Sequence, residues 1–151
     1  MNTKPILLVE DSEDDVRLTR RAFKKNNIAN QLIVVGDGVA AMEYLRGVAD
    51  TPDGRAPELP ALILLDLKLP KMDGLEVLRA LRAHPKLRRQ PVVILTTSKE
   101  EQDVITSYDL GANSYIRKPV DFEQFCAALH QLGLYWLVLN EPPPAPPGGP
   151  A

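Results

Sequence analysis

The chain lacks the features that mark secreted and membrane-spanning proteins. Its 151 residues include a single cysteine, Cys126, which excludes an internal disulfide and fits a reducing compartment. No apolar run approaches the roughly 20 residues that span a bilayer. The first apolar run begins at Ile6, which leaves no room for a signal peptide before it. We therefore expect a soluble, cytoplasmic protein with no membrane partner.

An excess of charge of one sign is also missing. The chain has 18 basic and 20 acidic side chains and a formal net charge of -2, so its charge gives no reason to expect nucleic-acid binding. It has no helix-turn-helix pattern, no basic stripe and no internal repeat. The length suits one domain with a full core. A transcription factor is therefore disfavoured.

Short apolar runs alternate with amphipathic segments along the chain. Strands are predicted at residues 6–9, 31–35, 61–65, 92–95 and 114–117. In the first helix, Val16, Leu18 and Phe23 recur at helical spacing. A fourth helix is predicted over residues 100–110 and ends at Gly111, whereas residues 47–60 are interpreted as a surface connection. Five β-α units without hairpin signals predict a parallel sheet with helices on both faces.

Charged residues follow three of the predicted strands. Glu10 and Asp11 follow the first, Asp66 the third and Lys118 the fifth. The ends of parallel strands share one edge, where ligand crevices form. Adjacent carboxylates repel each other unless a cation neutralises them, and oxygen ligands suit Mg²⁺. As alternatives, Glu10 and Asp11 open the first helix together with the acidic residues Glu13, Asp14 and Asp15, and Asp66 forms a turn. Three carboxylates at two strand ends nevertheless favour a magnesium site.

Two further residues extend this predicted site toward phosphate chemistry. The Lys118 ammonium can pair with a carboxylate or a phosphate oxygen. Thr96 follows the fourth strand and supplies a hydroxyl at the same edge, although a β-branched residue at a strand end is common without any function.

The order and spacing of these residues resemble the receiver domain of two-component response regulators over residues 4–132. The resemblance rests on Glu10-Asp11, Asp66 followed by Leu-Lys-Leu-Pro-Lys-Met-Asp-Gly, Thr96, and Tyr115-Ile-Arg-Lys118-Pro119. It implies a flavodoxin-like α/β fold with strand order 2-1-3-4-5. It also implies that a histidine kinase phosphorylates Asp66.

The resemblance further implies a role for each site residue. Asp11 and Asp66 would hold Mg²⁺ with the backbone carbonyl of Lys68, while Glu10 would act through water. The Lys68 side chain departs from the types most typical of that position. Its ammonium could reach the phosphoryl group and change the lifetime of the phosphorylated state, or it could be solvated and inert.

For the remaining residues, the resemblance implies roles in phosphoryl binding and switching. Thr96 and Lys118 would bind the phosphoryl oxygens. Tyr115 would be the aromatic switch residue, turning inward as Thr96 moves toward the new oxygens.

The C-terminal part of the chain gives indications of the proteins that this chain binds. We assign residues 1–133 to the receiver domain and residues 134–151 to an apolar extension and a proline-rich tail. Residues 134–139 carry the only tryptophan. They either continue the last helix on their own domain or cover a partner subunit. We favour the second reading and a homodimer through the last helix and extension.

The ending also resembles single-domain regulators paired with phytochrome-type histidine kinases, which implies such a kinase as partner.

Other classes of function fit the residues less well. A haloacid dehalogenase-type phosphatase also uses an aspartate nucleophile after a strand, but it needs a second acid where this chain has Lys68. A TOPRIM-type nuclease likewise needs paired aspartates. We expect a signalling protein and not an enzyme. A phosphate sink that drains phosphoryl groups from the kinase stays open as an alternative.

Overall fold

The computed structural model describes residues 4–26, 28–51, 59–96, 106, 108–112, 114–118 and 121–134, apart from the side chains of Thr96 and Phe122. Its strands are β1 (Ile6–Val9), β2 (Leu32–Val35), β3 (Leu62–Asp66), β4 (Val92–Thr96) and β5 (Ser114–Arg117). Its helices are α1 (Glu13–Lys25), α2 (Gly38–Ala49), α3 (Gly74–Ala83) and α5 (Phe122–Gln131). The helix predicted over residues 100–110 lies mostly outside the described residues, and its positions 106, 108 and 109 are helical.

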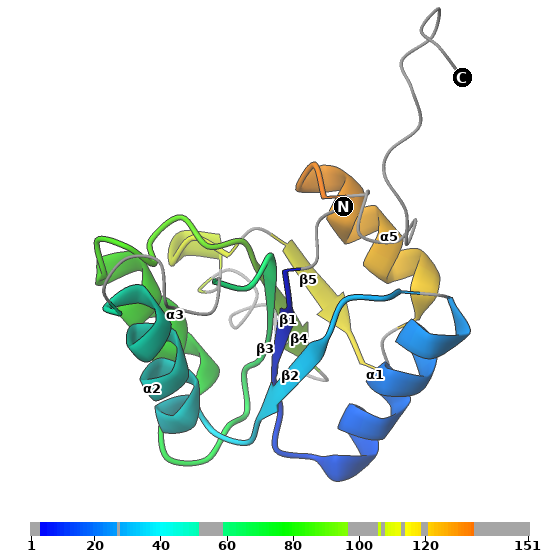
Figure 1. Cartoon of the computed structure of the whole chain (residues 1–151), viewed down its shortest axis with the longest axis horizontal. Helices are drawn as coiled ribbons and strands as arrows, with labels where there is room; N and C mark the ends of the chain where they lie inside the picture. Colours follow the sequence, from blue (N-terminus) through cyan, green and yellow to red (C-terminus); the bar gives the residue numbers. More distant parts are fainter. Residues whose placement is uncertain are drawn as a thin grey trace, which may run out of the picture.

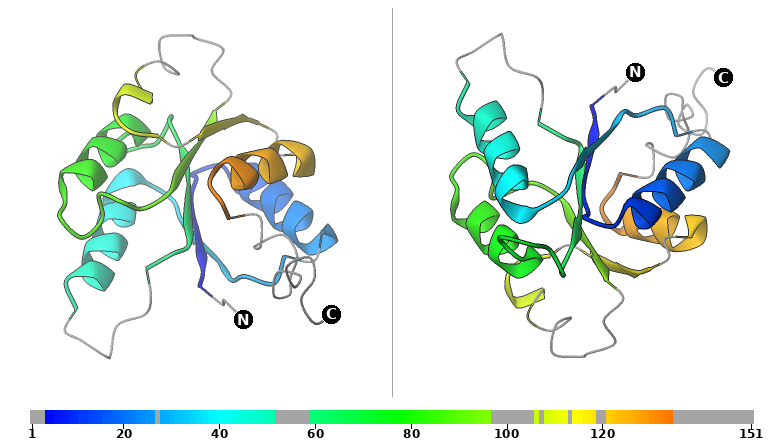
Figure 2. Two further views of the ribbon diagram at one scale, coloured as in Figure 1. Left: turned by 90° about the horizontal axis from the view of Figure 1, so that it is seen from above. Right: turned by 90° about the horizontal axis from the view of Figure 1, so that it is seen from below.

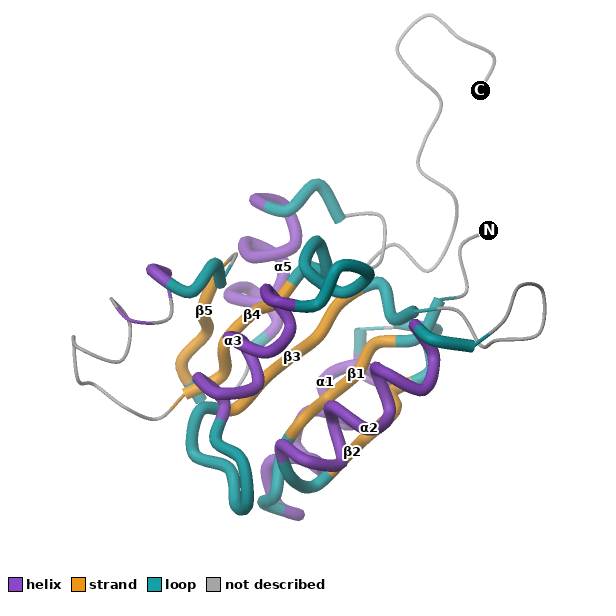
Figure 3. Tube along the Cα trace, turned by 90° about the vertical axis from the view of Figure 1, so that its left-hand side faces the viewer, coloured by secondary structure: helices purple, strands orange, loops and turns teal. Residues whose placement is uncertain are grey.

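The five strands form one parallel sheet in the order β2-β1-β3-β4-β5, as predicted (Figure 3). The register pairs Val9 of β1 with Leu65 of β3, and Asp66 of β3 with Leu95 of β4. The residues that follow β1 therefore lie beside Asp66, at the edge where parallel strands end together.

Helices cover both faces of the sheet (Figure 1, Figure 2). Successive side chains of a strand point to opposite faces, so Leu7 and Val9 enter one core and Ile6 and Leu8 enter the other. The first core is closed by α2 and α3 through Ala41, Met42, Leu45, Val77, Leu78 and Leu81. The second is closed by α1 and α5 through Phe23, Phe125, Ala128 and Leu129. Burial on both faces explains why the central strands are continuously apolar.

Two expectations about the helices were wrong. Leu18, placed on the apolar side of the first helix, has 44% of its surface exposed, while Thr19 is buried. Burial of Thr19 is tolerated because its hydroxyl donates to the Asp15 carbonyl at 2.9 Å. Residues 47–49, assigned to a surface connection, continue α2 to Ala49. Burial of Val48 outweighs the low helix propensity of Gly47.

Candidate functional site

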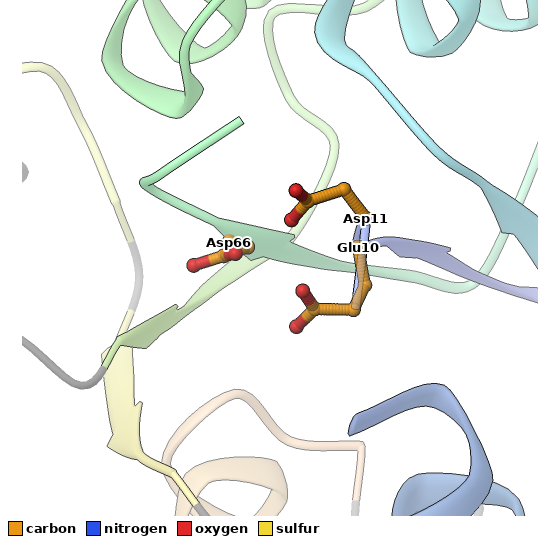
Figure 4. A group of neighbouring side chains, drawn as sticks. All are labelled: Glu10, Asp11 and Asp66. Atoms are coloured by element: carbon orange, nitrogen blue, oxygen red, sulfur yellow. The ribbon is translucent and has the colours of Figure 1, made fainter. Parts of the chain in front are cut away.

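Three carboxylates meet at the C-terminal edge of the sheet (Figure 4). Glu10 and Asp11 follow β1, and Asp66 is the last residue of β3. One oxygen from each lies within 4.8 Å of the other two. Glu10 and Asp66 are buried, whereas Asp11 is exposed. The strand ends thus bring together the three acids that the sequence singled out, and the group can offer a divalent cation oxygen ligands with access from solvent.

The Lys118 ammonium is the positive centre of this edge. It pairs with the Glu10 carboxylate and lies 3.2 Å from Asp66 Oδ2. Only 8% of the lysine side chain is exposed. Of the two kinds of partner considered for this ammonium, a carboxylate or a phosphate oxygen, the structure shows carboxylates. Burial lowers the pKa of Lys118, but its hydrogen bonds and charge pairs with Glu10, Asp66 and Asp15 outweigh burial and leave the pKa raised.

The Asp15 carboxylate also contacts the Lys118 ammonium, and the sequence did not predict this contact. Asp15 Oδ2 lies 3.0 Å from Lys118 Nζ. The sequence interpretation assigned Asp15 to the acidic first turn of a helix, which is correct for its backbone. Glu10 lies two residues before the N-cap Ser12 and accepts the Ser12 N–H. An acid in the first turn such as Asp15 could otherwise accept that N–H. An acidic residue at position 10 was therefore the sequence signal that the Asp15 side chain has a different partner.

Burial raises the pKa of Glu10 to about 7. The hydrogen bond from Lys118 opposes this shift, the negative charge of Asp66 adds to it, and the hydrogen bond from the Ser12 N–H lowers it again. Even beside the Lys118 ammonium, the Glu10 carboxylate is therefore costly to keep ionised in the folded protein. A cation among the three acids would supply further positive charge.

A tight turn links Asp66 to α3. The Lys68 N–H donates to Asp66 Oδ1 at 3.3 Å, and the Lys68 side chain is exposed. The Gly74 N–H donates to the Leu67 carbonyl at 3.0 Å, which folds the turn back against the end of β3. Asp73 then caps α3 by accepting the Glu76 N–H at 2.9 Å.

Thr96 and Tyr115 lie on the neighbouring strands. Thr96 ends β4 and pairs with Arg117 of β5, so its backbone is at the predicted edge, while its side chain lies outside the described part. Tyr115 is 38% exposed. Its ring packs edge-on against Tyr108, with ring centroids 5.9 Å apart.

A cleft of about 550 Å³ opens beside Glu10 and Asp11. It lies between the edge strand β2 and helix α1, which contributes the basic residues Arg17 and Arg20. Two residues of the acidic cluster, Glu10 and Asp11, therefore also line this cleft.

Comparison with known proteins decides the family. Residues 6–130 match the response regulator receiver domain. The chain belongs to this family. The receiver prediction and its strand order are confirmed, and the phosphatase and nuclease alternatives are not favoured.

Three relatives show which receivers the chain is similar to. It is 53% identical to the bacteriophytochrome response regulator RtBRR, covering 95% of this chain and 86% of that one at a TM-score of 0.78. It is 43% identical to the response regulator Rcp1 of Synechocystis sp. over 89% of each chain, and the Mn²⁺-bound Rcp1 structure has a TM-score of 0.69. It is 40% identical to the phosphorylated cyanobacterial phytochrome response regulator RcpA, covering 91% and 95% of the two chains at a TM-score of 0.71.

These receivers are similar to this chain over nearly its whole length. The protein is therefore a receiver-domain response regulator close to phytochrome-associated ones, and its acidic cluster fits a divalent cation. None of the helices in the part of the chain that the structure describes is long and apolar enough to cross a membrane.

Proposed function

We propose that this protein accepts a phosphoryl group on Asp66 from a phytochrome-type histidine kinase and carries the signal by changing its protein contacts. The observation that supports this most strongly is the environment of Asp66. Its carboxylate lies at a strand end, beside two further acids and 3.2 Å from a buried ammonium. Anionic phosphoryl transfer needs positioning and charge neutralisation at one point, and this edge offers both.

In the proposed reaction, an Asp66 oxygen attacks the phosphorus of a phosphohistidine. The new P–O bond forms as the P–N bond breaks, and the leaving imidazole nitrogen takes up a proton. Lys118 neutralises part of the phosphoryl charge from its place beside Asp66. The product is an acyl phosphate on Asp66.

The residues present fit Mg²⁺ as the cation. Asp11 and Asp66 would bind it directly with the backbone carbonyl of Lys68, and Glu10 would bind through water. An all-oxygen set of few protein ligands is typical of magnesium, which keeps several waters. When bound, the cation neutralises phosphoryl oxygens and orients the group for in-line transfer.

Thr96 and Tyr115 would convert phosphorylation into a change of surface. The Thr96 hydroxyl would bind a phosphoryl oxygen, and Tyr115 would turn inward from its half-exposed position beside Tyr108. The face that carries Tyr108 and Tyr115 would then differ between the two states.

The kinase and a second copy of the chain are the proposed partners. The similarity to RtBRR, Rcp1 and RcpA supports a phytochrome-type kinase, and the cleft between α1 and β2 lies beside the acids that the phosphohistidine must reach. The protein acts as a phosphorylated carrier and not as an enzyme with its own substrate.

A homodimer through α5 and the C-terminal extension fits the apolar sequence of that extension.

Replacement of the acceptor tests this function. The Asp66→Asn variant keeps the shape of the side chain, but its amide cannot attack phosphorus, so we expect labelling by a purified phytochrome-type kinase to fall below detection. Asp14→Asn, which removes an exposed acid, should label like the wild type. Labelling of Asp66→Asn at the wild-type rate would refute the assignment of the acceptor.

A further inference from the structure

Three acidic residues fill the first turn of α1, and one of them points elsewhere than its neighbours. Glu13 and Asp14 are exposed, and Asp14 has 86% of its side chain in solvent. The Asp15 side chain is 32% exposed and reaches Lys118, 103 positions later in the chain. The positive end of the helix favours all three acids alike, so it does not explain the direction of Asp15.

The hydrogen bonds at the start of α1 explain why Asp15 is available to Lys118. Asp15 is the third helical residue after the N-cap Ser12, a position from which an acidic side chain often reaches back to the N-cap N–H. Here the Ser12 N–H donates instead to Glu10 Oε2 at 3.2 Å. The Ser12 hydroxyl still accepts the Asp15 N–H at 3.3 Å. Glu10 thus takes the donor that Asp15 would otherwise use.

The Lys118 ammonium has enough N–H groups to donate one to Asp15. An ammonium has three N–H groups, and three carboxylates meet this one, from Glu10, Asp15 and Asp66. The contacts of Glu10 and Asp66 would change on binding of a cation or a phosphoryl group, because both belong to the acidic cluster that would bind it. Asp15 stands outside that cluster, so its contact with Lys118 can persist.

We propose that Asp15 is a positioning residue that holds the Lys118 ammonium in place for phosphoryl transfer to Asp66. The inference rests on the function proposed above. The N–H that faces Asp66 passes to a phosphoryl oxygen during transfer, while Asp15 retains its own. Because lysine is a flexible side chain with a compact charge, loss of this third contact lets the ammonium move away from the acceptor.

A double-mutant cycle tests this role. The rate constant for phosphorylation of Asp66 by phosphoramidate, with Mg²⁺ present, is measured in the full chain with and without Asp15→Asn. We expect Asp15→Asn to slow the reaction about five- to tenfold, the scale of one weakened charge-assisted hydrogen bond. Asp14→Asn removes the same charge from the same helical turn and should leave the rate unchanged. In a Lys118→Ala background, Asp15→Asn should have no further effect.

The outcomes separate this inference from the proposed function. An unchanged or faster rate in Asp15→Asn, or an equal loss in the Lys118→Ala background, overturns the positioning role. Asp66→Asn in the same assay tests the acceptor: if it is phosphorylated like the wild type, the proposed function fails whatever Asp15 does.

A second readout needs neither metal nor phosphoryl transfer. In ¹⁵N-labelled, metal-free protein at low temperature, the Lys118 ammonium should give a sharp correlation, because three carboxylates protect it from exchange with water. Lys118→Arg assigns that signal by removing it. The signal should be lost in Asp15→Asn and kept in Asp14→Asn. A signal with wild-type exchange in Asp15→Asn contradicts the inference.

Discussion

At the level of single residues, the stability of the site depends on the ionisation of Glu10. Its pKa is about 7 in the folded protein against an ordinary value of 4.5. Between these values the folded state binds the Glu10 proton more tightly than the unfolded chain does. Stability from this group is therefore fully present below pH 4.5 and is lost as the pH rises through 7. The raised pKa of Lys118 keeps the lysine charged throughout this window.

We predict that Glu10→Gln removes this pH dependence. In metal-free wild type, the free energy of unfolding from urea titrations should fall between pH 5 and pH 7.5 relative to Glu10→Gln, by no more than about 3 kcal/mol. Millimolar Mg²⁺ should shrink the difference, because a cation stabilises the ionised cluster. Glu13→Gln, which removes an exposed acid, should keep the wild-type slope. Equal slopes in wild type and Glu10→Gln would disprove the assignment.

At the level of secondary structure, the turn from β3 to α3 has almost no spare room. A Cβ on Gly74 would lie 2.2 Å from the Asp66 carbonyl oxygen and 2.7 Å from Leu67 Cα. Both neighbours are backbone atoms, so the turn itself must shift to admit a methyl group. The absence of a side chain at Gly74 thus allows α3 to begin directly against the proposed acceptor.

We predict that Gly74→Ala destabilises the protein by about 1–3 kcal/mol, the usual cost of overpacking. It should also weaken Mn²⁺ binding, measured by the paramagnetic resonance of free Mn²⁺, because the shifted turn carries Asp66 and Lys68. Gly47→Ala is the matched control in α2, where a Cβ meets nothing within 4 Å. It should stabilise by about 0.5–1 kcal/mol. Unchanged Mn²⁺ affinity in Gly74→Ala would contradict the role of the turn.

Sequence patterns predicted the positions of the helices and strands well, but not always which of their side chains are buried or which contacts these make. Apolar runs bounded by glycine, proline and helix caps located each described strand to within about one residue, which is the usual uncertainty of an element's end. Leu18 was misplaced because helical spacing alone did not identify Thr19, which satisfies its hydroxyl within the helix. Asp15 was missed for a related reason: its partner, Lys118, is distant in the sequence.

At the scale of the whole molecule, strand order explains why the acidic site could be predicted. Once the strands are parallel, residues after β1, β3 and β5 must share one edge, and the convergence of Glu10, Asp11 and Asp66 follows. Which side chain pairs with which does not follow, because it depends on rotamers and on competition for donors. For this reason, strand order alone did not predict that Lys118 contacts both Glu10 and Asp15.

The end of the domain lies just before the segment proposed to mediate self-association. Leu134 packs against the core beneath α1 and α5, and its N–H donates to the Leu129 carbonyl at 2.8 Å. Residues 135–139 read Tyr-Trp-Leu-Val-Leu and lie outside the described residues. Large aromatic side chains dominate interface energies when a partner buries them. We therefore propose that Leu134 serves the domain and that the apolar sequence after it serves the dimer.

A chain ended after Leu134 should fold and accept a phosphoryl group like the full-length protein, while light scattering shows its mass falling toward that of a monomer. Trp136→Ala should weaken self-association in the same direction and less strongly. A cut after Gly133, which also removes Leu134, should lower the free energy of unfolding further, because it takes an apolar contact and a backbone hydrogen bond from the core. If the chain ended after Leu134 kept the full-length mass, the extension would not form the interface, and if it failed to unfold cooperatively, the extension would belong to the core.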